Sequence, residues 1–295
     1  MRILVTGGSG FIGRNLVQRL RERGDEVVVL DLLQHPDPTV ECVVGDICDP
    51  DAVRRALGPG LDGVVHLAAL SSVLKSIQNP DGFFRTNVVG LETVLEVCRL
   101  EGVRSFVLSS TNAVCGDHGF QVINEKTDML PLTPYGATKA AGEMIMSAYA
   151  ASYGINTVAV RFTNVYGTGM QTKDSLVARL MKVAKSGGSI PVYGEGNQMR
   201  DYLFVADAVS AIELGLALDH ADVLTIGGGR SVSMLEIHAI ACEVTGVEIP
   251  TERVPAQPGE MPAVIVDTAH ARSLGFDPRY DIRAGIAATW QDFNR

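Results

Sequence analysis

A tyrosine and a lysine four residues apart form the pair in this sequence that is best suited to acid–base chemistry. Tyr135 and Lys139 belong to the segment Tyr-Gly-Ala-Thr-Lys, which follows Pro134 and opens a helical pattern. Residues at positions i and i+4 share one face of a helix, so both side chains can point toward one ligand. A phenol has a reference pKa of about 10, and a nearby ammonium lowers that pKa by favouring the phenolate. The pair therefore predicts a tyrosine base that a lysine assists.

A second polar segment, Ser109-Ser110-Thr111-Asn112-Ala113, directly follows a predicted strand. Ligands bind at the carboxyl ends of strands in open parallel sheets. Tyr135 could therefore take a proton from a bound hydroxyl group while the same carbon gives up a hydride. Thr111 could bond the same oxygen, and Lys139 could bond hydroxyls of a cofactor. Tyr-x-x-x-Lys also occurs in ordinary amphipathic helices, so a buried tyrosine that only packs is the alternative interpretation.

The first thirteen residues predict where a dinucleotide binds. The apolar run Met1–Val5 leads into Thr-Gly-Gly-Ser-Gly-Phe-Ile-Gly, with glycines at positions 7, 10 and 13. A helical pattern follows and stops at Gly24. This order of strand, glycine-rich turn and helix lets a backbone approach a pyrophosphate at the helix N-terminus. A glycine motif alone is weak support, but its surroundings here are those of a dinucleotide site.

The carboxylate that ends the next strand favours NAD over NADP. Asp31 follows the β-branched run Glu26–Leu30, roughly twenty residues past the glycines. There it can accept hydrogen bonds from an adenosine ribose, whereas it would repel a 2′-phosphate, and no Arg or Lys stands beside it. A solvated aspartate at a strand end is the alternative.

Strand and helix patterns alternate through the first half of the chain, which is typical of a parallel, doubly wound sheet. Strands are predicted at 3–5, 26–30, 42–44, 63–67, 105–108 and 157–161, and helices at about 11–23, 50–57, 80–101 and 135–153. The predicted fold class is α/β: a Rossmann-type sheet with a smaller, mixed α/β substrate-binding cap domain. Residues 1–165 form the NAD-binding domain, to which the chain returns near 204–228, and residues 166–295 form the cap.

Composition excludes several classes of protein. The chain has 295 residues, a net charge of −9 and no basic run, which disfavours a nucleic-acid partner. It has no apolar stretch long enough to span a bilayer, and the start lacks the apolar core of a signal peptide. Its five cysteines are scattered without Cys-x-x-Cys spacing, and its six histidines form no pair typical of a metal site. We therefore expect a cytoplasmic protein that binds neither membrane nor metal.

Ordered motifs along the chain resemble one family. The motifs are TGGSGFIG, GDI (45–47), HLAA (66–69), NVVG (87–90), SST (109–111), YGATK (135–139), RFTNVYG (161–167) and RDYLFVAD (200–207). Together they are similar to the extended short-chain dehydrogenase/reductase family, in its group of NAD-dependent nucleotide-sugar epimerases and dehydratases. The resemblance runs from Arg2 to Trp290.

The resemblance implies a role for each matching position. Thr111, Tyr135 and Lys139 are the expected catalytic residues. NAD is the expected cofactor, and the residues expected to bind it are Gly7, Gly10, Phe11, Ile12, Gly13, Asp31, Asp46, Ile47, Leu67, Ala68, Ala69, Asn87, Ser109, Tyr135, Lys139, Phe162 and Val165. A nucleotide-diphosphate sugar is the expected substrate, and the residues expected to bind it are Thr111, Asn112, Asn164, Val177, Val192, Tyr193, Arg200 and Glu260.

The residues after Thr111 bear on which reaction of the family the chain carries out. Dehydratases of the family have an Asp-Glu pair there, and members that decarboxylate a uronic acid have a Glu at the second position. Here the residues are Asn112 and Ala113, and neither can act as an acid or a base. We therefore expect a 4-epimerase that works through a transient 4-keto sugar.

Two other functions stay open. One is a dehydratase, lyase or unusual isomerase of the same family that uses Cys115, where the family has Tyr, or His118. The ordinary interpretations of these two are a gap-filling thiol and a solvated loop histidine. The other is a sensor that binds NAD without turnover, which the presence of all three catalytic residues argues against.

Further departures from the family's pattern concern the substrate. Its Arg-Pro-Gly-Asp reads Gln257-Pro258-Gly259-Glu260, which leaves Arg253 as a compensating charge, and its late Asn is Thr225. These changes indicate a specialised sugar nucleotide, whose sugar and base the sequence does not identify.

The resemblance also implies a homodimer through the helices near 87–101 and 135–153. Their apolar residues are consistent with this but would equally suit packing onto the sheet; they are Val88, Leu91, Val94, Leu95, Met144, Ile145 and Ala148.

Overall fold

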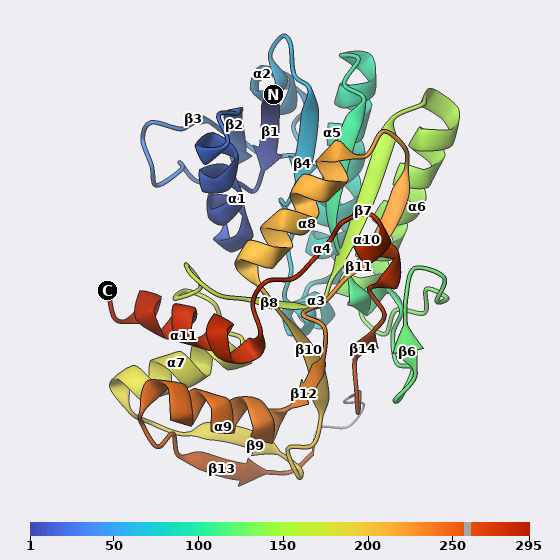
Figure 1. Cartoon of the computed structure of the whole chain (residues 1–295). Helices are drawn as coiled ribbons and strands as arrows, with labels where there is room; N and C mark the ends of the chain where they lie inside the picture. Colours follow the sequence, from blue (N-terminus) through green and yellow to red (C-terminus); the bar gives the residue numbers. More distant parts are fainter. Residues whose placement is uncertain (257–260) are drawn as a thin grey trace. The chain divides into compact units, whose positions relative to one another are not determined.

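The computed structural model describes residues 1–256 and 261–295. The chain divides into two compact units (Figure 1). Unit 1 comprises Met1–Gly116, Thr127–Arg161 and Val209–Leu224, and unit 2 comprises Asp117–Lys126, Phe162–Ala208 and Thr225–Arg295.

The seven-stranded sheet confirms the predicted doubly wound fold. Its order is β11-β7-β5-β4-β1-β2-β3, and β1 pairs in parallel with both β2 and β4. The strands are β1 (Arg2–Thr6), β2 (Glu26–Asp31), β3 (Glu41–Val44), β4 (Gly63–His66), β5 (Ser105–Thr111), β7 (Asn156–Phe162) and β11 (Asp222–Ile226). Because the strand order reverses between β1 and β4, the carboxyl ends of these two strands lie at the switch point where this kind of sheet binds ligands.

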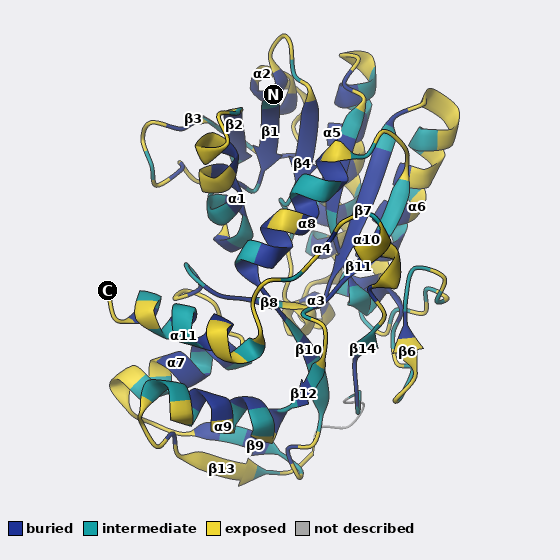
Figure 2. Ribbon diagram, viewed as in Figure 1, coloured by how far each residue is buried: buried dark blue, intermediate teal, exposed yellow. Residues whose placement is uncertain are grey.

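Helices cover the sheet, and most residues of its inner strands β1, β4, β5 and β7 are buried. The helices are α1 (Phe11–Glu22), α2 (Pro50–Leu57), α3 (Val73–Gln78), α4 (Pro80–Phe84), the π-helix η1 (Arg85–Val89), α5 (Gly90–Leu100), the 3₁₀-helix η2 (Asn112–Val114), α6 (Pro134–Tyr153) and α8 (Val205–Ala217). Strands buried on both faces read as continuous apolar runs, as β4 does with Gly-Val-Val-His (Figure 2).

The predicted helical segment over 80–101 is helical throughout in the structure, but it contains a π-helical turn that the sequence did not indicate. The structure has α4, then the π-helix η1, then α5. A π-helix accommodates an extra residue in a helical turn and is often found at functional sites. Here it contains Asn87, which is 4% exposed and bonded on both sides of its amide. The apolar pattern of the segment does not indicate these bonds, because they join Asn87 to residues distant in sequence.

Three of the residues considered for a dimer interface belong instead to the core of unit 1. Leu91, Val94 and Leu95 are at most 1% exposed and pack with Leu4, Val64 and other strand residues. For these three, packing onto the sheet is the correct interpretation, since α5 turns them inward. Met144, by contrast, is 59% exposed.

Unit 2 is a smaller mixed α/β body, as predicted for the cap. β10 (Met199–Phe204) pairs in parallel with β8 (Asn164–Tyr166) and antiparallel with β12 (Ser231–Ser233). Two further pairs are β9 (Ile190–Tyr193) with β13 (Thr251–Val254), and β6 (Val122–Ile123) with β14 (Ile265–Val266). The helices are α7 (Leu176–Ser186), α9 (Met234–Thr245), α10 (Ala269–Ser273) and α11 (Ile282–Phe293), of which α7, α9 and α11 pack together.

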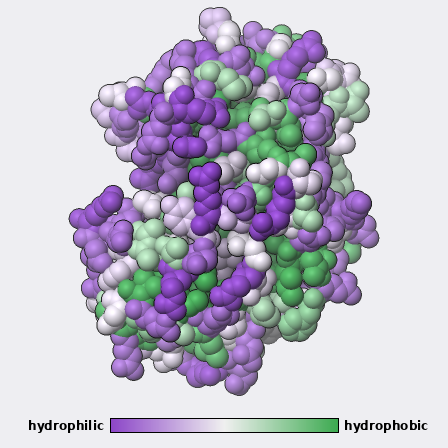
Figure 3. All heavy atoms as spheres, in the orientation of Figure 1, coloured by the Kyte–Doolittle hydropathy of each residue, from purple (hydrophilic) through white to green (hydrophobic). Residues whose placement is uncertain are grey.

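Some large apolar side chains are exposed in both units, for example Leu74 and Phe120. The face drawn in Figure 3 shows several areas where hydrophobic residues gather among hydrophilic ones. In the part of the chain that the structure describes, no helix has the length and apolar character needed to cross a membrane.

Close approach of the glycine-rich turn to α1 depends on Gly13. A Cβ at this position would lie 2.3 Å from the carbonyl oxygen of Gly7 and 2.7 Å from the Cα of Gly8. Both neighbours are backbone atoms of the turn, so they cannot move aside without moving the turn itself. The glycine therefore sets the distance at which α1 begins beneath the turn.

We expect Gly13→Ala to lower the free energy of unfolding by roughly 1–3 kcal/mol, because overpacking forces the backbone apart. It should also weaken NAD binding, since the turn is displaced. Chemical denaturation and NAD titration measure the two effects. Gln18→Ala on the exposed face of α1 is the matched control, and a Gly13→Ala protein as stable as this control would contradict the steric argument.

Candidate active site

Thr111 lies at the carboxyl end of β5, where the strand gives way to η2. It is 8% exposed, and its Oγ1 accepts a hydrogen bond from the Ala113 N–H at 3.2 Å. This local bond caps η2 and thereby holds the hydroxyl in one orientation.

The start of α6 brings Tyr135 to this strand end. Thr133 caps the helix by accepting a bond from the Gly136 N–H at 3.3 Å, and Pro134 occupies its first turn. Gly136 lets α6 approach η2 closely, since a Cβ there would lie 2.6 Å from the carbonyl oxygen of Ala113. Tyr135 is thereby within hydrogen-bond reach of Thr111.

Lys139 follows one turn later on the same face. It is 5% exposed, and its Nζ donates a hydrogen bond to the carbonyl oxygen of Ser109 at 2.7 Å. The structure thus brings together the three predicted catalytic residues Thr111, Tyr135 and Lys139, with Ser109, in unit 1.

Burial shifts the pKa values of the tyrosine and the lysine in opposite directions. Burial raises the pKa of Tyr135, and the hydrogen bond with Thr111 opposes this only in part. Burial lowers the pKa of Lys139 to about 8, and the charge of Glu143 opposes that shift. The sequence predicted a Tyr135 pKa lowered by Lys139; here burial outweighs any such effect, because desolvation disfavours the phenolate.

Asn87 ties this region to the loop after β4. Its side-chain amide donates to the Leu70 carbonyl oxygen and to Thr138 Oγ1, both at 3.0 Å, and its Oδ1 accepts from the Leu70 N–H at 2.9 Å. Thr138 in turn donates to the carbonyl oxygen of Tyr135 at 2.8 Å. Asn87 therefore links the loop after β4 to the first turn of α6.

The turn at the start of α1 fits a pyrophosphate. Its N-cap is Gly10, which has no side-chain cap, and the first turn carries no acidic residue, so backbone N–H groups are available to an anion. A Cβ at Gly10 would lie 3.2 Å from the carbonyl oxygen of Gly7, which is closer than an ordinary contact, so the turn itself favours glycine here. Phe11 and Ile12 begin α1 directly behind it.

Asp31 is held beside this turn. Its two carboxylate oxygens accept bonds from the N–H groups of Ser9 at 3.0 Å and Leu33 at 3.1 Å, and the Gly7 N–H donates to the Leu30 carbonyl oxygen at 2.8 Å. Each carboxylate oxygen keeps a second lone pair, so the group can still accept from a ribose. The chemistry of the donor set thus fits NAD.

The loops after β3 and β4 hold the other predicted cofactor residues of unit 1. Asp46 accepts a bond from the Cys48 N–H at 2.9 Å, and Ile47 is 5% exposed. Leu67 donates its N–H to the Thr6 carbonyl oxygen at 3.0 Å, and Ala68 donates to Thr6 Oγ1 at 3.3 Å. Ala69 follows, partly exposed. Two further residues predicted for NAD, Phe162 and Val165, fall in unit 2.

Unit 2 contains a cavity of about 240 Å³ that includes two of the predicted substrate residues, Tyr193 and Arg200. It is lined by Asp174, Leu176, Arg179, Ile190, Pro191, Tyr193, Gln198, Arg200, Tyr202 and Met234. Val177 and Val192 are each 1% exposed and pack in the interior, while their neighbours Leu176 and Pro191 reach the cavity.

Sequence reasoning missed Arg179 and Tyr202 as lining residues of this cavity. Tyr202 lies two residues after Arg200 on β10, so period-2 alternation places it on the same face of the strand. This signal was available in the sequence. Arg179 had no comparable signal, because its place depends on how α7 packs.

The remaining predicted substrate residues lie elsewhere. Asn112 is in η2 of unit 1, and Asn164 is exposed on β8, where its amide donates to the Asp201 carbonyl oxygen at 3.0 Å. Glu260, with Gln257, Pro258 and Gly259, lies outside the described residues. Arg253 donates to the Gly194 carbonyl oxygen at 2.7 Å and lies near Glu195.

The structure also shows where Cys115 and His118 lie, the two residues considered as alternative catalytic groups. Cys115 is 1% exposed, with its sulfur 3.9 Å from Nη1 of Arg161, which supports the gap-filling interpretation. His118 belongs to unit 2, where its carbonyl oxygen accepts a bond from the Gln121 N–H at 3.0 Å.

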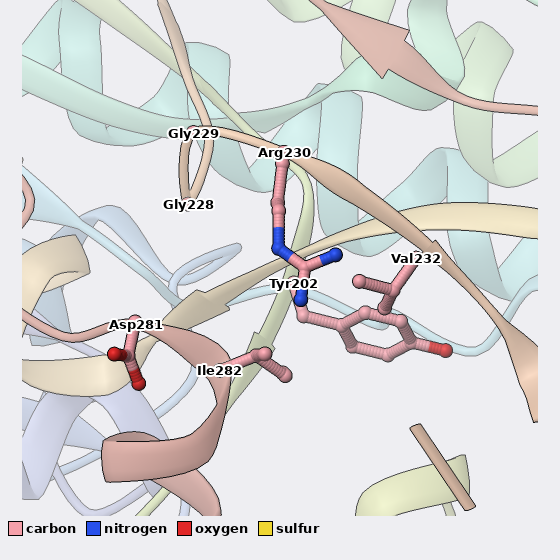
Figure 4. Close-up of a pocket in the computed structure, with 7 residues that line it drawn as sticks. All are labelled: Tyr202, Gly228, Gly229, Arg230, Val232, Asp281 and Ile282. Carbon is pink, nitrogen blue, oxygen red and sulfur yellow. The ribbon is translucent and has the colours of Figure 1, made fainter. Parts of the chain in front are cut away.

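Unit 2 contains a second cavity of about 240 Å³, whose lining residues are drawn in Figure 4. The two charged side chains that line it already have partners within the protein. Arg230 pairs with Glu236 at 2.6 Å, and Asp281 caps α11 by accepting from the Ala284 N–H at 2.8 Å. Tyr202 lines this cavity as well as the first. These internal partners point to a structural role for both charged side chains.

The buried charge of Lys139 predicts a trade-off between stability and function. The folded pKa of about 8 lies below the ordinary 10.5, so the folded protein binds the proton less tightly than the unfolded chain. Lys139→Met should therefore raise the free energy of unfolding at pH 7, by about 1–3 kcal/mol after loss of the bond to Ser109.

Urea unfolding of the NAD-free protein measures this effect. The native sequence should gain stability as the pH rises from about 8 toward 10.5, and the variant should lack that gain. A variant that is less stable than the native sequence at pH 7 and has the same pH dependence would show that burial of the Lys139 ammonium does not destabilise the folded protein.

Comparisons with known proteins agree with this geometry. Residues 3–227 match the model of the NAD dependent epimerase/dehydratase family. The dTDP-glucose 4,6-dehydratase of Streptomyces niveus is 35% identical, over 100% of this chain and 94% of that protein.

Solved structures match over the whole chain. The UDP-glucose 4-epimerase of Thermus thermophilus in complex with NAD is 31% identical, with a TM-score of 0.94 and coverage of 100% of this chain and 99% of that one. The Thermotoga maritima UDP-glucose 4-epimerase with UDP-glucose is 30% identical, with a TM-score of 0.95 and the same coverage. The chain belongs to the NAD-dependent epimerase/dehydratase family, and NAD is its cofactor.

Proposed function

We propose that the protein is a nucleotide-sugar 4-epimerase. The observation that carries the proposal is the convergence of Thr111, Tyr135 and Lys139 at the end of β5, followed by two residues without a carboxylate, Asn112 and Ala113. With NAD as the hydride acceptor and donor, these three groups suffice for an oxidation and reduction at one carbon, which is all that epimerisation at C4 requires.

The chemistry assigned to the chain is proton transfer at the sugar C4 hydroxyl. Tyr135 takes the proton as the ketone forms and returns it after the bound 4-ketose has turned over. Thr111 bonds the same oxygen, and Lys139 holds the ribose of the nicotinamide and favours the phenolate. When bound, NAD accepts the hydride from C4 and gives it back to the opposite face.

Similarity alone does not separate the two reactions of the family. The relatives include a 4,6-dehydratase at 35% identity and 4-epimerases at 30% and 31%, all aligned over the full chain. The choice therefore rests on the site. Elimination of water needs an acid and a base beyond Tyr135, and Asn112 and Ala113 supply neither. A dehydratase remains the second candidate because of the relative just named.

For the substrate, we propose that unit 2 holds the nucleotide diphosphate in the cavity that contains Arg200. A guanidinium can fork onto phosphate oxygens, and the ring of Tyr193 offers an apolar face to a base. Arg179 is a further cation in the same cavity.

We also propose a homodimer in the cytoplasm. Met144 and Ala148 are exposed on α6, and Val89 is 41% exposed on η1, which packs against α6; these exposed apolar residues support contact with a second copy. The five free thiols support a reducing compartment.

The reaction is tested by product analysis. Purified protein incubated separately with UDP-, GDP- and dTDP-sugars should convert a sugar nucleotide to an isomer of the same mass, inverted at C4 by NMR. A product that has lost water would favour the dehydratase, and the absence of any product with NAD bound would favour a sensor.

Tyr135→Phe should lower kcat by roughly 10²–10⁴-fold, because it removes the proton-transferring group. NAD should stay bound, since only a hydroxyl is lost. Tyr153→Phe, at the exposed end of the same helix, is the matched control. Turnover and NAD content are measured on the same samples, and a Tyr135→Phe protein with the native kcat would refute the assignment of the base.

A further inference from the structure

A fully buried ion pair lies one helical turn beyond Lys139. Glu143 on α6 is 6% exposed and Arg161 on β7 is 3% exposed. Arg161 Nη2 lies 2.7 Å from Glu143 Oε2, and Arg161 Nε lies 3.0 Å from Glu143 Oε1, so the pairing is bidentate. A guanidinium and a carboxylate held in this way are among the strongest charge-assisted contacts in proteins.

The pair is also bonded to the catalytic strand. The hydroxyl of Ser110 donates to Glu143 Oε1 through a short hydrogen bond. Ser110 stands between Ser109, whose carbonyl oxygen accepts the bond from Lys139, and Thr111, which faces Tyr135. The carboxylate of Glu143 therefore restrains Ser110, and both chain neighbours of Ser110 belong to the candidate site.

The fold alone gives no reason for charge at this place. A buried ion pair can often be replaced by apolar side chains of similar volume without loss of stability, because the desolvation cost offsets the attraction. The pair lies next to a core of apolar residues on β5 and α5, which such a replacement would extend. This suggests that the charge serves the site.

The charge of Glu143 also acts on Lys139. The carboxylate of Glu143 faces it from the same helix and favours its ammonium form, while burial opposes that form. On β4, His66 also faces Lys139, but burial lowers the pKa of His66 to about 3, so it is neutral and adds no charge. Arg161 on β7 carries a positive charge. The carboxylate of Glu143 contacts the Arg161 guanidinium and thereby offsets the effect of this charge on Lys139.

We propose that Glu143 is a positioning residue of the reaction: held by Arg161, it anchors Ser110 at the end of β5 and provides the negative charge that keeps Lys139 protonated beside Tyr135. This inference rests on the proposed function for the roles of Lys139 and Tyr135, and it assigns a new role to the buried pair. Glu143 acts through these residues and need not touch the substrate.

The first test removes the charge but keeps the shape. In the NAD-loaded enzyme, Glu143→Gln should lower the pKa of Lys139 by about one unit, because a carboxylate is lost and Arg161 becomes an unscreened cation. The alkaline limb of the kcat/KM–pH profile should move to lower pH by the same amount, with little change at the acid end. Glu143→Asp, which keeps the charge, should restore the native limb.

The titration of Lys139 is followed directly by NMR of protein labelled with ¹⁵N-lysine, with Lys139→Met to assign the signal. This readout does not depend on turnover. A purely structural role of Glu143 would lower activity equally at every pH and leave the lysine titration in place, which would overturn the proposal.

Glu143→Gln leaves a buried guanidinium without its partner and could prevent folding. A second variant, Glu143→Leu/Arg161→Met, replaces both charges by apolar side chains, and the expected result is a folded protein that binds NAD with kcat at least roughly tenfold lower and the alkaline limb displaced. Native kcat and an unmoved limb in this variant would overturn the proposal.

The matched control is Glu243→Gln, which breaks an exposed pair with Arg283 in unit 2 and should alter none of these readouts. The two levels of inference fail separately. If the native protein converts no nucleotide sugar, the proposed function fails while the lysine titration still reports on Glu143. If turnover is found but the titration ignores Glu143, only the role of the pair fails.

Discussion

The buried ammonium of Lys139 is the constraint on which the site in unit 1 depends. A charge that is 5% exposed is costly, and its lowered pKa of about 8 expresses that cost. The charge persists because the Ser109 carbonyl oxygen accepts one of its protons and a carboxylate lies one turn away. These partners come from β5 and from α6, so the two elements must keep a fixed separation for the charge to be tolerated.

Much of the surrounding structure can be understood as the means of fixing that separation. Gly136 allows α6 to begin against η2, and the Thr111 hydroxyl caps η2. The π-helix η1 turns Asn87 inward, where it bonds the loop after β4 and the helix residue Thr138. In each case side-chain hydrogen bonds or close packing fix the backbone. Together these contacts restrict the positions of the Thr111 and Tyr135 hydroxyls.

The family shows why fold and reaction must be argued separately. The same chain-long similarity extends to an epimerase and to a dehydratase. The overall fold therefore does not distinguish the two reactions. The proposed choice between them depends on very few side chains, here Asn112 and Ala113, which lie outside the sheet in η2.

Local patterns in the amino-acid sequence were enough to specify the parallel sheet and the glycine-rich turn, and they single out Thr111, Tyr135 and Lys139 as candidates for catalysis. Apolar runs that alternate with helical periods predict the sheet, and glycine spacing predicts the turn. The i, i+4 rule puts Tyr135 and Lys139 on one face. Because such patterns depend on near neighbours, they can be interpreted without a structure.

The tertiary structure was needed to learn that burial raises the pKa of Tyr135, that Leu91 faces the sheet, and that Glu143 pairs with Arg161. The interruption of the segment 80–101 by a π-helix, and the place of Leu176 rather than Val177 in the lining of the unit 2 cavity, likewise emerged only on folding. All of these depend on contacts between residues distant in sequence, whose desolvation and packing no local pattern records.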